Sequence, residues 1–163
     1  MKGSRLRNRD RYLEEAMLFR DTDLIKVITG VRRCGKSSLL DLIRMAIESE
    51  GVAGRGFVSV NLESKGTGIK TEDQLYDYVR GRLSDKGRTY VFIDEPQRID
   101  GWQDAVNAMR VDFDCDIYLT GSNAYLLSSE LATYLSGRYV EVKMLPLSFS
   151  EFADFCVIEF VSG

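Results

Sequence analysis

The stretch TGVRRCGKSS at residues 29–38 constrains the fold of this chain more than any other part of its sequence. Gly30 and Gly35 stand five positions apart and are followed by Lys36 and Ser37, which completes the GxxxxGKS/T pattern. In such loops, successive backbone N–H groups surround a phosphate, and a side chain at either glycine would crowd it. A strand pattern precedes the stretch and a helical pattern follows it. The stretch therefore predicts a phosphate-binding loop, in preference to a structural turn with an accidental Lys-Ser pair.

The residues of the loop have distinct expected roles. Lys36 is expected to reach the β- and γ-phosphates and to act in catalysis, and the Ser37 hydroxyl to ligate Mg²⁺. The helix that begins near residue 36 points its positive end at the anion. The predicted nucleotide contacts are Gly30, Val31, Arg32, Arg33, Cys34, Gly35, Lys36, Ser37 and Ser38.

Two arginines and a cysteine are unusual inside the loop. Arg32 and Arg33 either add positive charge beside the polyphosphate or are solvated on the outer side of the loop. Cys34 is interpreted as a small loop residue without chemistry of its own.

Apolar periodicity predicts the α/β class. Strand patterns alternate with stretches that have the three- and four-residue apolar spacing of helices. This alternation, with short connections, predicts a parallel sheet covered by helices on both faces, in a single domain over residues 1–163. The predicted strands are 24–29, 57–62, 90–94, 116–120 and 139–145, and the predicted helices are 36–50, 72–84, 102–111 and 124–136.

A pair of acidic residues ends the third predicted strand, in YVFIDEPQ. Asp94 is expected to complete the Mg²⁺ shell, and Glu95 to polarise an attacking water. A small-molecule kinase would not need Glu95, because its substrate supplies the nucleophile. The alternative is an acidic turn before Pro96 without a role in chemistry.

Polar residues also follow the fourth strand, in YLTGSNA. Thr120, Ser122 and Asn123 are placed to reach the γ-phosphate or the water, and Asn123 is the predicted sensing residue, unless it only N-caps the next helix. No NKxD element for guanine follows, which favours ATP as the nucleotide. Arg138, before the fifth strand, is predicted to serve a neighbouring subunit as an arginine finger, with an intramolecular salt bridge as the alternative.

Composition excludes several classes of protein. With no histidine in the chain, a Ser-His-Asp triad and a Cys/His zinc site are ruled out. Three widely spaced cysteines favour reduced thiols in a cytoplasm. No apolar run approaches the roughly 20 residues that cross a membrane. A net charge of −3 gives no global basic field for nucleic acid, although Lys2, Arg5, Arg7, Arg9 and Arg11 form either a solvated arm or a nucleic-acid contact.

Together these residues resemble the prokaryotic AAA-type ATPases of the AAA_14 group. The likeness rests on ITGVRRCGKSSLL, FIDEPQRIDGWQDAVNAMR, IYLTGSNAYLLSSELATYLSGRY and LPLSFSEF, and runs from about residue 5 to residue 155. It implies a P-loop NTPase fold, a three-layer α/β/α sandwich whose five-stranded parallel sheet has the order 5-1-4-3-2. It also implies a further C-terminal domain, often of the DUF4143 type. Pro96 replaces the aliphatic residue usual in the family, which bears on how Glu95 is aimed.

The function predicted from these features is that of an ATP-binding, Mg²⁺-dependent ATPase domain. The alternative is a nucleotide-gated switch with very slow turnover, and a small-molecule kinase lacks a recognisable acceptor site. Arg138 adds the expectation of a homo-oligomer.

The last residues predict a partner surface. Phe149, Phe152, Cys156 and Phe160 share one stripe of a helix predicted over residues 148–163. An exposed stripe of this kind predicts self-association or a contact with a downstream domain or another protein. The alternative is that these residues fold back onto the core or fray.

Overall fold

The computed structural model describes residues 10–52, 56–122 and 133–146. Strands and helices alternate along the chain, as the apolar periodicity predicts. In order they are α1 (Asp10–Met17), β1 (Ile25–Gly30), α2 (Lys36–Ser49), β2 (Phe57–Asn61), the short helix η2 (Lys65–Thr67), α3 (Glu72–Arg80), β3 (Thr89–Asp94), the short helix η3 (Pro96–Arg98), α4 (Trp102–Asp112), β4 (Cys115–Ser122) and β5 (Tyr139–Met144).

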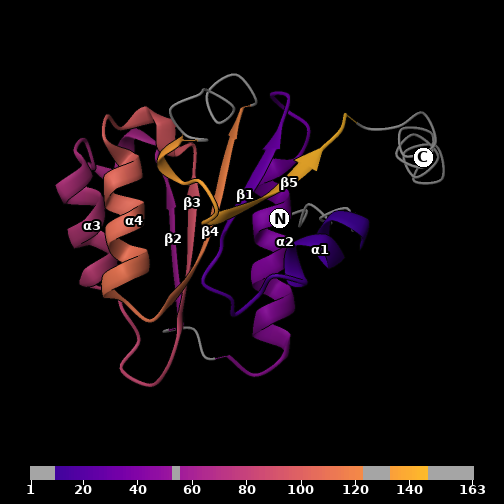
Figure 1. The fold of residues 1–163 in the computed structure, drawn as a ribbon, viewed down its shortest axis with the longest axis horizontal. Coiled ribbons are helices and arrows are strands. Elements are labelled where there is room, and N and C mark those ends of the chain that lie inside the picture. The colour runs from indigo at the N-terminus through magenta and orange to yellow at the C-terminus, as the bar shows by residue number, and fades with distance from the viewer. Residues whose placement is uncertain (1–9, 53–55, 123–132, 147–163) are drawn as a thin grey trace, which may run out of the picture.

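The five strands form one parallel sheet with the order β2-β3-β4-β1-β5. This is the predicted order 5-1-4-3-2 read from the other edge, so the predicted fold class is confirmed. Helices α3 and α4 cover one face of the sheet, and α1 and α2 cover the other (Figure 1). The result is a three-layer α/β/α sandwich with an apolar core on each side of the sheet.

Each core is built from alternate residues of the strands and the apolar face of the helices. In β1, Ile25 and Val27 face α3 and α4, whereas Ile28 faces α1 and α2. In α2, the residues with three- and four-residue apolar spacing are all buried: Leu39, Leu40, Ile43 and Ile47. On the α2 side, stacked aromatic rings from β2, β3 and β4 run across the sheet: Phe57, Phe92 and Tyr118, with 6.3 Å and 5.1 Å between successive ring centroids.

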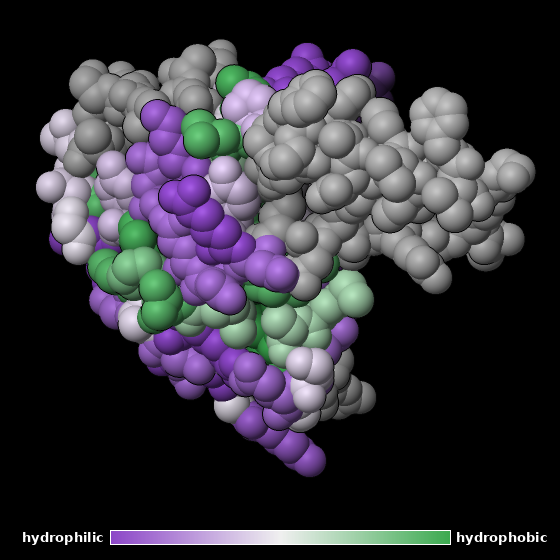
Figure 2. Space-filling view, turned by 90° about the vertical axis from the view of Figure 1, so that its right-hand side faces the viewer, coloured by the Kyte–Doolittle hydropathy of each residue, from purple (hydrophilic) through white to green (hydrophobic). Residues whose placement is uncertain are grey.

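The outer surface is mainly polar. Figure 2 shows that hydrophilic side chains predominate in the described part of one side of the molecule, with small apolar areas between them. None of the helices in the described ranges is both long and apolar enough to cross a membrane.

Element boundaries within the described residues differ from the predicted ones by more than one residue at two places. The helix predicted over 72–84 ends at Arg80, and its C-cap is Gly81, a poor helix former. Strand β4 continues to Ser122, two residues beyond its predicted end, because Gly121 and Ser122 pair with the end of β1. Most of the helix predicted over 124–136 lies outside the described residues, as do Asn123 and the C-terminal segment 148–163.

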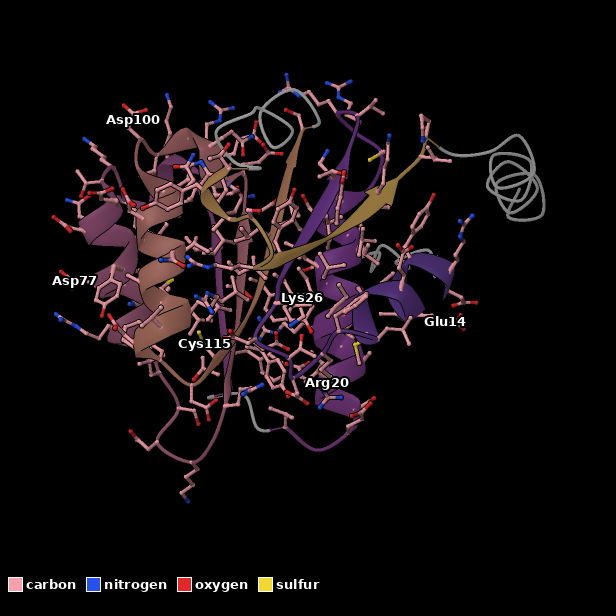
Figure 3. All side chains as sticks on the ribbon, in the orientation of Figure 1. Glu14, Arg20, Lys26, Asp77, Asp100 and Cys115 are labelled. Atoms are coloured by element: carbon pink, nitrogen blue, oxygen red, sulfur yellow. The ribbon has the colours of Figure 1, made fainter. Side chains whose placement is uncertain are left out.

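A buried ion pair joins the amino ends of the central strands. Lys26 on β1 and Asp116 on β4 form a salt bridge, and both side chains are fully buried. Asp116 also accepts hydrogen bonds from the Tyr118 hydroxyl at 3.1 Å and from the backbone N–H of Asp21 at 2.9 Å. Lys26 and Arg20 lie at this lower end of the sheet in Figure 3, far from Asp100 at the other end. The carboxyl ends of the strands are thus left for a separate site.

Candidate nucleotide-binding site

The loop between β1 and α2 has a backbone that needs its glycines. Gly35 has a φ of 94°, in the left-handed region that side chains disfavour. A Cβ at Gly30 would lie 2.6 Å from Cys34 Sγ and 2.8 Å from the Met144 carbonyl oxygen, closer than atoms approach without displacement. Arg33 also adopts a positive φ, of 65°. The glycine spacing read from the sequence therefore corresponds to a tight turn packed against the end of β5.

Lys36 lies across this turn. Its side chain is buried, and its Nζ donates to the carbonyl oxygens of Gly30 at 3.2 Å and Val31 at 3.0 Å. Both acceptors are neutral, and an anionic group is a stronger partner for a buried ammonium. The first turn of α2 follows directly, with a glycine as its N-cap, so the N-cap residue itself has no side chain to occupy the free N–H groups. Ammonium and helix end together favour an anion at this place.

Asp94 connects the loop to β3 and β4. Its Oδ2 accepts a hydrogen bond from Ser37 Oγ at 2.6 Å, and its Oδ1 accepts one from Thr120 Oγ1. Thr120 Oγ1 in turn accepts the backbone N–H of Glu95 at 3.1 Å. Three elements that are distant in sequence are therefore joined at the carboxyl edge of the sheet.

The oxygen atoms of Ser37 and Asp94 suit a magnesium ion. A hydroxyl and a carboxylate at hydrogen-bonding distance are hard ligands, and Mg²⁺ commonly takes one or two protein ligands and completes its shell with phosphates and water. Within the described ranges, no group of three or more His, Cys, Asp or Glu side chains is arranged to hold a metal.

A smaller cavity of about 320 Å³ lies beside this pair. Asp41, one turn along α2 from Ser37, lines it together with Asp94 and Arg44. Burial, and secondly the charge of Asp94, raise the pKa of the Asp41 carboxyl above its usual value, against the opposing effect of Arg44. A cation near Asp94 would therefore be stabilised by the negative charge of these carboxylates.

Glu95 has an unusual backbone. Its φ of 59° and ψ of 51° place it in the left-handed region, and Pro96 then begins η3. Its carboxylate accepts a hydrogen bond from the Gln97 side-chain amide. Pro96 thus starts a short helix directly after the acid pair, and Glu95 lines the same cleft as the loop.

A cleft of about 690 Å³ brings the loop and the acid pair together. Its loop side is formed by Arg32, Arg33, Gly35, Lys36, Ser37 and Ser38, and its other side by Glu63, Glu95, Gln97, Arg98 and Ser122. Gly30, Val31 and Cys34 of the predicted contacts do not line it. The Cys34 side chain is buried in the core beneath the loop.

Three residues of the cleft were not anticipated from the sequence. Glu63 forms ion pairs with Arg32 at 3.6 Å and with Arg98 at 3.2 Å, and Gln97 contacts Glu95. Arg32 is therefore mostly exposed on the loop, with its guanidinium paired to Glu63. The sequence does contain a signal for Glu63. It follows the carboxyl end of β2, and parallel strands place their carboxyl ends at the same edge of the sheet.

Arg138 lies away from the cleft. It is exposed just before β5, its backbone carbonyl accepts the N–H of Ile25 at 2.9 Å, and its Nη1 lies 3.3 Å from Asn107 Oδ1. Ile25 begins β1, whereas the loop follows the other end of that strand. Arg138 therefore does not belong to the cleft of its own chain.

The AAA_14 family model, described as an AAA domain, matches residues 22–153. The match covers most of the chain and includes both the loop and the acid pair. The chain belongs to this AAA domain family. The resemblance seen in the sequence is thereby confirmed, and the domain is of the nucleotide-binding, ATPase-like kind.

Two relatives are much longer than this AAA domain. An uncharacterized protein of Haemophilus influenzae is 48% identical over 147 residues, which cover 89% of this chain and 37% of the relative. An uncharacterized protein of Methanocaldococcus jannaschii is 36% identical over 132 residues, which cover 80% of this chain and 28% of the relative. The AAA domain thus spans little more than a third of the first relative and less of the second.

Solved structures share the fold of the AAA domain. Saccharomyces cerevisiae RIF2 has a TM-score of 0.60 at 10% identity, covering 90% of this chain and 59% of that one. A DNA polymerase III gamma subunit-related protein of Thermotoga maritima has a TM-score of 0.60 at 14% identity, covering 89% and 48%. The Aeropyrum pernix ORC2 protein, solved as ADPNP-ADP complexes, has a TM-score of 0.56 at 10% identity, covering 91% and 49%. At such identities the likeness concerns the fold alone.

Proposed function

We propose that this chain is an ATP-binding, Mg²⁺-dependent ATPase domain. The observation that carries the proposal is the linkage of Ser37, Asp94 and Thr120, since Ser37 also lines the cleft that contains Lys36 and Glu95. Each side chain has the chemistry that phosphoanhydride hydrolysis requires, and the fold brings them together from the start of α2 and the carboxyl ends of β3 and β4.

In this proposal the loop binds the triphosphate. Lys36 exchanges its two carbonyl acceptors for the β- and γ-phosphate oxygens, and the backbone N–H groups of the loop and of the first turn of α2 hold the remaining charge. Arg33 and Ser38 line the same side of the cleft and add contacts there. ATP is preferred to GTP because the sequence has no NKxD element.

Ser37 and Asp94 would hold the magnesium ion, which supplies positive charge for the β- and γ-phosphate oxygens. Glu95 then accepts a proton from a water molecule, and the water oxygen attacks the γ-phosphorus as the bond to the β-phosphate oxygen breaks. The products are ADP and inorganic phosphate. Asn123, outside the described residues, is proposed to sense the γ-phosphate.

The proposal includes a neighbouring copy of the chain. Arg138 is exposed beside the edge strand β5, where a second subunit would meet it. As an arginine finger it would stabilise transition-state charge in the neighbour's cleft. The proposal also includes a cytoplasmic location and a partner such as a downstream DUF4143-type domain.

A nucleotide-gated switch with slow turnover is the second candidate. Glu63 connects Arg32 of the loop with Arg98 after the acid pair, so a ligand at the loop could alter the position of η3. In that case nucleotide binding, and not its hydrolysis, would be the useful event.

Two variants test the ATPase proposal. Lys36→Ala should weaken ATP binding sharply in calorimetry, whereas Glu95→Gln should bind Mg·ATP normally and lose steady-state phosphate release, keeping only residual single-turnover hydrolysis. Lys86→Ala, an exposed lysine in the turn before β3, is the matched control and should behave as wild type. Equal ATP affinity for wild type and Lys36→Ala would refute the binding site. Wild-type turnover by Glu95→Gln would refute Glu95 as the base, and normal binding without any wild-type turnover would favour the switch.

A further inference from the structure

The side chain of Gln97 contacts that of Glu95. Gln97 lies two residues further along, in η3, and both side chains line the 690 Å³ cleft. Its Nε2 donates a hydrogen bond to Glu95 Oε2. A donor on this oxygen restricts the rotation of the carboxylate. The orientation of the Glu95 carboxylate in the cleft therefore depends on Gln97.

The backbone fixes Gln97 relative to Glu95. The N–H of Glu95 is bonded to Thr120 Oγ1 at 3.1 Å, and the N–H of Arg98 is bonded to the Glu95 carbonyl at 3.2 Å. Ile99, which follows, is buried in the core. A left-handed conformation at a residue with a side chain costs of order 1–3 kcal/mol and persists only where its surroundings impose it. The contact between the two side chains is therefore set by a short segment anchored at both ends.

The amide of Gln97 carries a cost for the fold. Within the described part of the chain, its Oε1 is buried and has no hydrogen-bond partner. A buried acceptor left in this state is destabilising, and an apolar side chain of the same length would avoid the cost. Residues that reduce stability in this way are expected where function requires them. The useful part of the Gln97 side chain is thus its N–H group, which Glu95 accepts.

We propose that Gln97 is a positioning residue for hydrolysis: its amide N–H holds the Glu95 carboxylate in the orientation that removes a proton from the attacking water. This inference rests on the proposed ATPase function. Gln97 acts on the reaction only through Glu95, and it takes no part in binding the triphosphate. Loss of its N–H group therefore affects turnover and leaves nucleotide affinity unchanged.

Gln97→Met tests this assignment, because methionine keeps the length of the side chain and removes both polar amide atoms. The expected result is a kcat lower by about 10²-fold, the loss typical of a misplaced catalytic group. The KM and the affinity for Mg·ATP should be unchanged, and the melting temperature should be equal or higher. Gln103→Met, at a half-buried glutamine of α4 that does not line the cleft, is the matched control and should keep its kcat.

A double-variant cycle separates positioning from a structural role. In the Glu95→Gln background, adding Gln97→Met should not lower single-turnover hydrolysis any further, because its effect passes through Glu95. Unchanged kcat in Gln97→Met, or a lower kcat with an equal fall in ATP affinity and melting temperature, would overturn the inference.

The two proposals can fail separately. If Glu95→Gln is inactive and Gln97→Met is fully active, Glu95 remains the base and only the role of Gln97 is wrong. If Glu95→Gln has wild-type turnover, the base assignment and the role of Gln97 both fail. The side-chain amide signals of Gln97 in NMR, assigned by their loss in Gln97→Met, should shift in Glu95→Gln, and signals that do not move would contradict the contact itself.

Discussion

The Ser37 hydroxyl lies 2.6 Å from Asp94 Oδ2, although 57 positions separate the two residues in the chain. Ser37 lies in the first turn of α2, which follows β1 and the loop. Asp94 is the last residue of β3, which is separated from β1 by β4 in the sheet. A hydroxyl and a carboxylate held together at the carboxyl edge of a parallel sheet form two adjacent ligands for a divalent cation. This hydrogen bond thus joins the glycine-rich loop and the acid pair, which the sequence alone places on separate elements.

Removal of the Ser37 hydroxyl should uncouple nucleotide affinity from magnesium. Ser37→Ala keeps Lys36 and the loop backbone, so ATP should still bind without metal, but added Mg²⁺ should no longer increase the affinity. Calorimetric titration of ATP with Mg²⁺ or with a chelator measures this difference. Ser49→Ala, at the far end of the same helix, should retain the full response to magnesium. A normal magnesium response in Ser37→Ala would show that the hydroxyl is not a ligand.

Most of the fold follows from local signals in the sequence. Leu39, Ile43 and Ile47 show helical spacing, and all are buried in the core. The glycine spacing around residues 30–35 predicted a turn whose Gly30 has no room for a side chain. Local signals are sufficient here because periodicity depends on neighbouring residues alone.

Contacts between distant segments could not be predicted in the same way. Lys26 reads as a polar residue inside an apolar strand, and its partner Asp116 stands 90 positions away. Likewise, Glu63 and Gln97 enter the cleft because β2 and η3 end beside the loop. Such contacts can be predicted only when the strand order is known, because the residues that form them are close in space but distant in sequence.

Gly30→Ala should disrupt the loop. The new Cβ would lie 2.8 Å from the Met144 carbonyl oxygen, a backbone atom that cannot move without disturbing β5. Overpacking of this kind costs about 1–3 kcal/mol in the free energy of unfolding, and ATP affinity should fall as well. Gly66→Ala, whose Cβ would make only an ordinary contact at 3.6 Å, is the matched control. Urea unfolding and calorimetry measure both effects, and wild-type values for Gly30→Ala would contradict the tight turn.

Removing only one member of the Lys26–Asp116 ion pair should destabilise the fold more than removing both charges. Lys26→Met leaves a buried carboxylate without its counter-ion, which should lower the free energy of unfolding by about 3–5 kcal/mol. Adding Asp116→Asn removes the stranded charge and should restore a large part of this loss. Lys143→Met, at an exposed position of β5, should change the urea midpoint little. If the double variant is no more stable than Lys26→Met, the carboxylate is not the source of the cost.

Cys115 should react slowly with thiol reagents at neutral pH. Burial, and secondly the charge of Asp116, raise the pKa of its thiol from 9.0 to about 12. At pH 8 the folded protein then has about 10³-fold less thiolate than the unfolded chain, and iodoacetamide labelling should slow in proportion. Mass spectrometry of the labelled peptide, with and without urea, compares the two rates.

The same shift predicts how stability depends on alkaline pH. Because the folded pKa is raised, the contribution of Cys115 is complete below pH 9 and is lost as the pH rises toward 12. Cys115→Ala should therefore show a weaker decline of the urea midpoint over this interval than wild type. Equal declines, or rapid labelling of the folded protein at pH 8, would show that the thiol is exposed to solvent.

Arg138 should act only on a neighbouring subunit. It precedes β5 at the level of Ile25, while the loop begins five strand residues further along at Gly30, a distance of roughly 17 Å at the rise of a parallel strand. Its guanidinium is directed to Asn107 on α4. An arginine at the far end of β1 cannot contact phosphates in its own cleft, so any contribution to turnover requires a second copy.

A mixing experiment isolates this contribution. Arg138→Ala and Lys36→Ala should each have little activity alone, because one lacks the finger and the other the phosphate site. In a mixture, an intact cleft of the Arg138→Ala subunit can receive Arg138 from a Lys36→Ala neighbour, so phosphate release should reappear. Arg82→Ala, an exposed arginine beyond α3, is the control that should stay fully active alone. Arg138→Ala that is as active as wild type, or activity that stays absent when the two variants are mixed, would exclude the finger.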